Sequence, residues 1–191
     1  ATLQSRYGES ALVHAGLELD SDRPKMRPLP MPEVAAALRG PSPPRFVAQV
    51  LIDLEAMPQP GASSTMAAGG FLSRFGLDGE RVRVGTGRPD LLEVVEGGSQ
   101  PLLRVWDFKA SQSARHEHFI QVAFYTFLLE HALPAVGLDA YAVDTQYGLI
   151  YSREGPDEFE LAPYRLAVEE FLRHRLMPLL ATEAAAAHYL V

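Results

Sequence analysis

"GRPDLLEVV", from Gly87 to Val95, and "LLRVWDFKAS", from Leu102 to Ser111, are the two stretches that decide the fold. Each contains an apolar run of strand length, and a short glycine-containing segment joins them, so they predict two neighbouring β-strands. Side chains alternate between the two faces of a strand, and residues two apart therefore share a face. Asp107 and Lys109 are predicted to lie on one face, with the aromatic residues beside them directed to the other.

Asp90 comes just before the first of these strands. If the two strands pair, Asp90 lies beside Asp107, and two neighbouring carboxylates repel each other unless a cation binds between them. Mg²⁺ is usually held by one or two carboxylates together with water and substrate phosphate, so two aspartates are enough for a site. The chain has only two lysines, and Lys109 is placed where it can orient a water or neutralise charge on a phosphate. These residues predict a site for Mg²⁺ or Mn²⁺.

A helix is predicted directly after this strand. Apolar residues recur at three- and four-residue steps from Glu117 to His131, which is typical of a helix packed on a core. Gln121 and Tyr125 are four apart and share one face of it. A helix that follows the Asp-x-Lys strand can aim both polar side chains at the same edge of the sheet.

The order "GRPDLL", "VWDFKAS", "HFIQVAFY" resembles the PD-(D/E)XK nuclease superfamily, and more narrowly the RecB-like exonuclease family, which includes the nucleases of CRISPR adaptation. The resemblance covers residues 85–125, with a strand-then-helix continuation to about residue 180. It implies an α/β fold with a restriction-endonuclease-like core, a central mixed β-sheet flanked by helices. It also implies a metal-dependent deoxyribonuclease that hydrolyses phosphodiester bonds in DNA repair, recombination or defence. Gln121 and Tyr125 match the family's motif that positions substrate or supports the site.

Carried over residue by residue, the resemblance makes Asp90 and Asp107 metal ligands. Lys109 becomes the catalytic lysine, and the backbone carbonyl of Phe108 becomes a further ligand. The expected cofactor is Mg²⁺ or Mn²⁺.

The family usually supplies one more ligand from a helix upstream of the first strand. His14, in "GESALVHAGLE", resembles the family's G-x-x-x-H helix, although the segment also reads as a strand. Glu55 is the second candidate and Asp53 the third, since residues 45–56 have helical spacing.

The composition narrows the class of protein. A net charge of −7 argues against a generic polyanion-binding surface, so DNA would need a local patch, for which Arg88 and Arg115 are the candidates. The absence of cysteine means that the chain as given can hold no four-cysteine iron–sulfur cluster of the kind some relatives carry. No apolar run approaches the roughly 18 residues that span a bilayer, so we expect no membrane partner and a cytoplasmic location.

We expect one compact domain, with residues 1–60 as a partly helical N-terminal elaboration and residues 61–191 as the nuclease core. The chain begins without methionine and stops inside a regular segment, which suggests a piece of a longer protein. The remaining predictions are strands at 11–19, 81–84, 141–143 and 149–151, helices at 33–39 and 164–180, a linker at 57–70, and a turn at 153–158.

Two further functions stay open. A catalytically degenerate nuclease-like module would bind DNA or scaffold a helicase–nuclease assembly, and the missing upstream ligand motivates this alternative. An unrelated α/β protein would carry the motif by coincidence, and a separation of Asp90 and Asp107 beyond about 8 Å would favour it.

Overall fold

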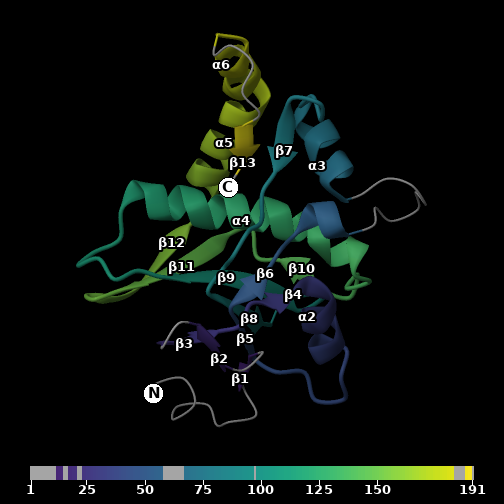
Figure 1. Ribbon diagram of the computed structural model, residues 1–191. Coiled ribbons are helices and arrows are strands. Elements are labelled where there is room, and N and C mark those ends of the chain that lie inside the picture. Colours follow the sequence, from purple (N-terminus) through teal and green to yellow (C-terminus); the bar gives the residue numbers. More distant parts are fainter. Residues whose placement is uncertain are drawn as a thin grey trace.

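The computed structural model describes residues 12–14, 17–20, 23–57, 67–96, 98–182 and 188–190. Its centre is a mixed sheet of seven strands in the order β1-β5-β8-β9-β11-β12, with β10 also paired to β9 (Figure 1). β9 is antiparallel to β8 on one side and parallel to β10 and β11 on the other. The strands of this sheet are β1 (Leu12–Val13), β5 (Phe46–Ala48), β8 (Leu91–Val95), β9 (Leu102–Phe108), β10 (Ala142–Val143), β11 (Tyr147–Ser152) and β12 (Gly155–Glu160).

Three smaller strand pairs lie outside the central sheet. They are β2 (Leu17–Asp20) with β3 (Arg23–Met26), β4 (Leu29–Pro30) with β6 (Val50–Leu51), and β7 (Val82–Val84) with β13 (His188–Leu190). The strand predicted at residues 81–84 is therefore present as β7, but it does not belong to the sheet that contains β8 and β9.

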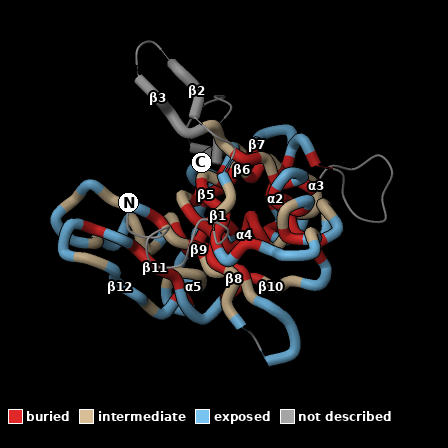
Figure 2. Tube along the Cα trace, turned by 90° about the horizontal axis from the view of Figure 1, so that it is seen from below, coloured by how far each residue is buried: buried red, intermediate tan, exposed pale blue. Residues whose placement is uncertain are grey.

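One helix, α4 (His116–Ala135), lies across a face of the sheet (Figure 1). All its residues from 122 to 129 are buried, because α4 packs against β9 and β11 and is enclosed by α3 (Ala67–Phe75) and α5 (Ala162–Glu170). A helical stretch that is buried on all sides, as residues 122–129 are, belongs in a core. Figure 2 shows this buried layer between exposed outer loops. The prediction of an α/β fold with a mixed central sheet flanked by helices is confirmed. Among the described helices, none is long and apolar enough to cross a bilayer.

The prediction of a helix at residues 45–56 is wrong. The segment forms β5, β6 and the single 3₁₀ turn η2 (Leu54–Ala56), and β5 pairs with β8. Phe46 packs on one side of the sheet and Val47 on the other, so the run is apolar on both faces, as a fully enclosed strand requires. Pairing with a distant strand outweighs the local helical spacing. The helix predicted at residues 33–39 is present as α2 (Met31–Leu38).

Two other predictions need correction. The predicted linker at 57–70 contains the start of α3, while residues 58–66 lie outside the described ranges. The predicted turn at 153–158 is shorter than expected: Ser152 pairs with Gly155, and β12 then runs antiparallel to β11. Gly155 has φ +113°, a conformation that a side chain disfavours, and this lets the chain reverse in two residues.

The C-terminal helical segment contains a π-helical turn. α5 continues through η3 (Phe171–Arg175) into α6 (Leu176–Thr182), so the helical segment predicted at 164–180 is present and runs past Pro178. In a regular α-helix, the ring of Pro178 would clash with the carbonyl of His174, four residues earlier. His174 belongs to the π-helical turn η3, which is wider than a regular α-helical turn and leaves room for the proline ring.

Glu130 ties α3, α4 and α5 together. Its Oε2 accepts a hydrogen bond of 2.8 Å from Arg74 on α3, and its Oε1 accepts one of 2.7 Å from Arg165 on α5. The Arg165 guanidinium also lies 4.1 Å from the centre of the Phe127 ring. The carboxylate is about one-fifth exposed, so water screens these contacts less than it screens a surface pair.

We expect Glu130→Gln to lower the free energy of unfolding by about 1–3 kcal/mol, because each charge-assisted hydrogen bond becomes a weaker neutral one. Urea denaturation measures this. The control is Glu169→Gln, which breaks the more exposed pair of Glu169 with Arg173 and should cost less than about 0.5 kcal/mol. Equal losses in the two variants would contradict the cross-bracing role of Glu130.

Candidate active site

Asp90 and Asp107 are neighbours across the β8–β9 pair. Leu91 pairs with Trp106, so one further step in this register sets Asp90 opposite Asp107. Antiparallel partners have Cβ atoms about 4.5–5.5 Å apart. Asp90 stands two residues before Leu92, and Asp107 stands two residues after Val105, the partner of Leu92 on β9. Leu92 and Val105 face α4 and the main core, so the two aspartates point to the same side of the sheet. The separation that would have favoured a coincidental motif is not found.

Both oxygens of Asp90 are held. Oδ1 accepts a hydrogen bond of 3.0 Å from the side-chain amide of Gln49, and Oδ2 accepts one of 2.8 Å from the backbone N–H of Phe108. The backbone N–H of Gln49 also donates to the carbonyl of Asp90 at 2.8 Å. This carboxylate is therefore fixed between β5 and β9.

Gln49 has an unusual backbone. Its φ is +52°, and it is the one non-glycine residue with positive φ in the part of the chain that the structure describes. This conformation costs of order 1 kcal/mol and persists only where the surroundings impose it. Sequence reasoning missed Gln49, and the only signal available was a polar side chain inside the apolar run from Phe46 to Ile52.

Asp107 is 3% exposed. The ammonium of Lys109 lies 2.5 Å from its Oδ2, and the two groups form a close ion pair. Burial raises the pKa of Asp107 to about 6; Lys109 opposes the shift, and the negative charge of Asp90 adds to it. The site thus contains a buried carboxylic acid, Asp107, whose ionised form is destabilised by its burial.

Lys109, Gln121 and Tyr125 form a hydrogen-bonded chain. The Lys109 ammonium donates to Gln121 Oε1 at 2.8 Å, and Gln121 Nε2 donates to the Tyr125 hydroxyl at 2.8 Å. Burial and then the charge of Asp107 raise the pKa of Tyr125, so its phenol stays protonated. The predicted face of α4 therefore does meet the end of β9, and five predicted residues come together in one place.

Gly87 allows the turn before Asp90 to pack directly on α4. A Cβ at this position would stand 2.6 Å from Leu128 Cδ1 and 3.4 Å from Tyr125 Cδ1, and the first distance is far inside van der Waals contact. The glycine of "GRPD" is thus required for space, and it sets how closely the turn approaches Tyr125.

His14 comes directly after the edge strand β1. Leu12 on β1 pairs with Phe46 and packs with it on the face of the sheet away from α4. His14 itself is exposed and stands beyond the end of this strand, so its assignment as a metal ligand stays a prediction.

Glu55 and Asp53 are not grouped with the aspartate pair among the described residues. Glu55 is exposed on η2, and Asp53 Oδ1 accepts hydrogen bonds from the backbone N–H groups of Glu55 at 3.1 Å and Ala56 at 3.2 Å. That carboxylate is used as a cap. Within the described ranges, no group of three or more His, Cys, Asp or Glu side chains is placed to hold a metal ion.

The two predicted phosphate contacts lie at different places. Arg88 is exposed in the turn just before Asp90. Arg115 caps α4 and lies 3.7 Å from Glu117, where water weakens the pair because both side chains are about two-thirds exposed.

The donor set suits a hard cation. Besides the two carboxylates it includes the carbonyl of Phe108, which leaves β9 on the same edge as the N–H that binds Asp90. Mg²⁺ and Mn²⁺ prefer oxygen ligands and need few from protein. A cation bound by Asp107 would also lower the pKa of that carboxyl.

Comparison with protein-family models, with curated proteins and with solved structures found no match to this chain.

We expect Asp107→Asn to stabilise the protein at neutral pH in the presence of EDTA. The folded-state pKa of Asp107, about 6, lies above its value of 3.8 in the unfolded chain, so ionisation disfavours the fold. The stability of the wild type should fall relative to the variant as pH rises from about 4 to 6. Above that range the gain should be constant, on the order of 1–3 kcal/mol.

Denaturation of both proteins between pH 3.5 and 8 measures this difference. Asp157→Asn, at an exposed position of β12, is the control and should give no such gain. A variant that is less stable than the wild type at pH 7.5 would contradict the burial cost assigned to Asp107.

Proposed function

We propose that this protein is a divalent-metal-dependent DNA nuclease of the PD-(D/E)XK type, with a restriction-endonuclease-like core and RecB-like motifs. One observation supports it above all. The Asp90–Asp107 pair and the Lys109–Gln121–Tyr125 chain meet at one end of β9, in the order and on the elements that the motifs require.

The two aspartates and the Phe108 carbonyl would hold Mg²⁺ or Mn²⁺. A cation bound there supplies Lewis-acid polarisation of a phosphate and lowers the pKa of a bound water. Gln49 and the Phe108 N–H keep the Asp90 carboxylate in one orientation. The protein's share of the chemistry is therefore a preformed, partly buried pair of carboxylates. The Lys109 ammonium, which lies 2.5 Å from Asp107 Oδ2, would have to move aside for a cation to bind that oxygen.

Lys109 acts from the side of α4. Gln121 restrains its ammonium, so the positive charge stays next to the metal site instead of moving into solvent. In this position it orients an attacking water or neutralises charge that develops on the phosphate. Tyr125, through Gln121, supports the lysine at one remove.

The small number of acidic metal ligands among the described residues favours a second function, that of a module without catalytic activity. The described residues provide two carboxylates and no third acidic or histidine ligand near them. A catalytically degenerate module that binds DNA, or that scaffolds a helicase or another subunit of a larger assembly, has the same fold and needs no turnover.

We expect the wild type to cleave single- or double-stranded DNA with Mg²⁺ or Mn²⁺ and to be inactive in EDTA. Asp107→Asn and Lys109→Met should each lower kcat/KM by at least about 100-fold, because each removes a group that acts on the reacting phosphate. Asp157→Asn is the matched control and should retain full activity. A gel assay with end-labelled DNA measures the rates.

Unchanged cleavage by Asp107→Asn and Lys109→Met would rule out the site assignment. DNA binding without cleavage, together with no thermal shift on addition of Mn²⁺, would instead establish the degenerate module.

We expect cleavage to decline as pH falls through about 6 at low metal concentration. Protons compete with the cation for Asp107, whose pKa is about 6 without metal. Raising the Mg²⁺ concentration should move the midpoint of the decline to lower pH. A midpoint that does not respond to Mg²⁺ would show that another group limits the rate.

A further inference from the structure

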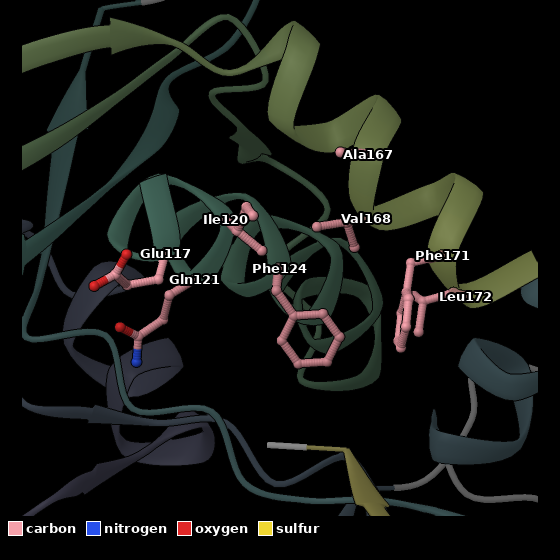
Figure 3. A pocket seen from close by; sticks show the side chains of 8 residues that line it. All are labelled: Glu117, Ile120, Gln121, Phe124, Ala167, Val168, Phe171 and Leu172. Carbon is pink, nitrogen blue, oxygen red and sulfur yellow. The ribbon is translucent and has the colours of Figure 1, made fainter. Parts of the chain in front are cut away.

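A groove runs between α4 and the α5–η3 segment, directly beside the candidate active site. It is a cavity of about 560 Å³ whose walls are mostly apolar (Figure 3). It is lined by Glu117, Ile120, Gln121, Phe124, Ala167, Val168, Phe171 and Leu172.

Gln121 belongs both to the groove and to the site. Its Oε1 accepts the hydrogen bond from Lys109, and the same side chain forms part of the groove wall. A molecule bound in the groove is therefore separated from the Lys109 ammonium by one side chain. A ligand of the active site could occupy both places at once.

The apolar walls suit a flat aromatic group. In Figure 3 the ring of Phe124, from α4, and the ring of Phe171, from η3, line the groove from its two sides. Phe171 is 41% exposed and Ile120 is 43% exposed, so an incoming ring would remove substantial apolar surface from water. Every nucleobase has a π-face that stacks on such side chains without regard to sequence.

Basic residues stand beside the groove among acidic ones. η3 contains Arg173, His174 and Arg175, but Arg173 pairs with Glu169 and His174 lies 3.8 Å from Glu170. Glu117 lies in the groove wall. The charge here is therefore balanced, and the apolar walls together with the shared Gln121 favour a base in the groove.

We propose that this groove binds an unstacked nucleobase of single-stranded DNA, next to the phosphate that Lys109 faces. The inference deepens the proposed nuclease function and rests on it. A base within a duplex is stacked and paired and cannot enter a groove between two helices without flipping out. The groove therefore selects single strands, or strand ends that have frayed.

The test uses Phe171→Ala and Ile120→Ala, with Leu166→Ala as the matched control. Leu166 is an exposed apolar residue of α5 that is 69% exposed and does not line this groove. The probe is a single-stranded oligonucleotide with 2-aminopurine at successive positions, titrated in EDTA so that no cleavage occurs. A matched strand lacks the base at the position where fluorescence is most quenched.

Phe171→Ala should weaken binding of the intact strand by roughly 5- to 140-fold, the effect of removing one base–aromatic stack, and should abolish the quenching. Ile120→Ala should act in the same direction, Leu166→Ala should have no effect, and the abasic strand should bind all four proteins alike. If Phe171→Ala and Leu166→Ala bind the intact strand with equal affinity, or if the intact and abasic strands bind the wild type equally, the groove takes no base.

Cleavage with Mg²⁺ separates this inference from the proposed function. Cleavage that is unaffected by Phe171→Ala leaves the nuclease and removes the base-binding groove. Loss of quenching in Phe171→Ala, in a protein that never cleaves, supports the groove and removes the nuclease.

Discussion

The structure depends on two carboxylates held side by side under a helix. Asp107 is almost fully buried, and Asp90 adds a second negative charge next to it. Water solvates the buried Asp107 poorly, so the protein must supply positive charge and hydrogen-bond donors from several elements. Lys109 supplies the charge, Gln49 and the Phe108 N–H supply donors, and α4 must lie close enough for Gln121 to restrain the lysine. The packing of α4 on the sheet is thus part of the electrostatics of the site.

The cost of this arrangement is offset elsewhere in the fold. Gln49 has a left-handed backbone, and the Asp107 carboxylate is buried; both features destabilise the folded state. The surrounding fold provides stability through the buried middle of α4, residues 122–129, and through Glu130, which joins three helices. Strain that is concentrated at a prospective binding site, in an otherwise well-satisfied molecule, is what a preorganised site requires.

The sequence predicted those features that depend on local pattern. β8 and β9 have the two-residue period, α4 has the helical period, and the polar residues stand on these strong elements, so their convergence could be foreseen. The features that the sequence did not predict depend on contacts between residues far apart in the chain. Residues 46–48 become a strand because β8 is beside them. Gln49 could not be predicted as a site residue, because its role arises only from its contact with Asp90, far along the chain.

Strand β9 carries core-packing residues along most of its length and charged residues at its end. Leu103 and Val105 point into the core toward α4, and Asp107 and Lys109 continue the same face beyond them. The first half of the strand holds the layers together, and its end holds the charged groups. Because these duties fall on different residues, Asp107 and Lys109 can be lost by substitution while the apolar positions preserve the sheet. A chain that had lost them would keep this shape, so the shape alone does not tell which related chains carry the charged pair.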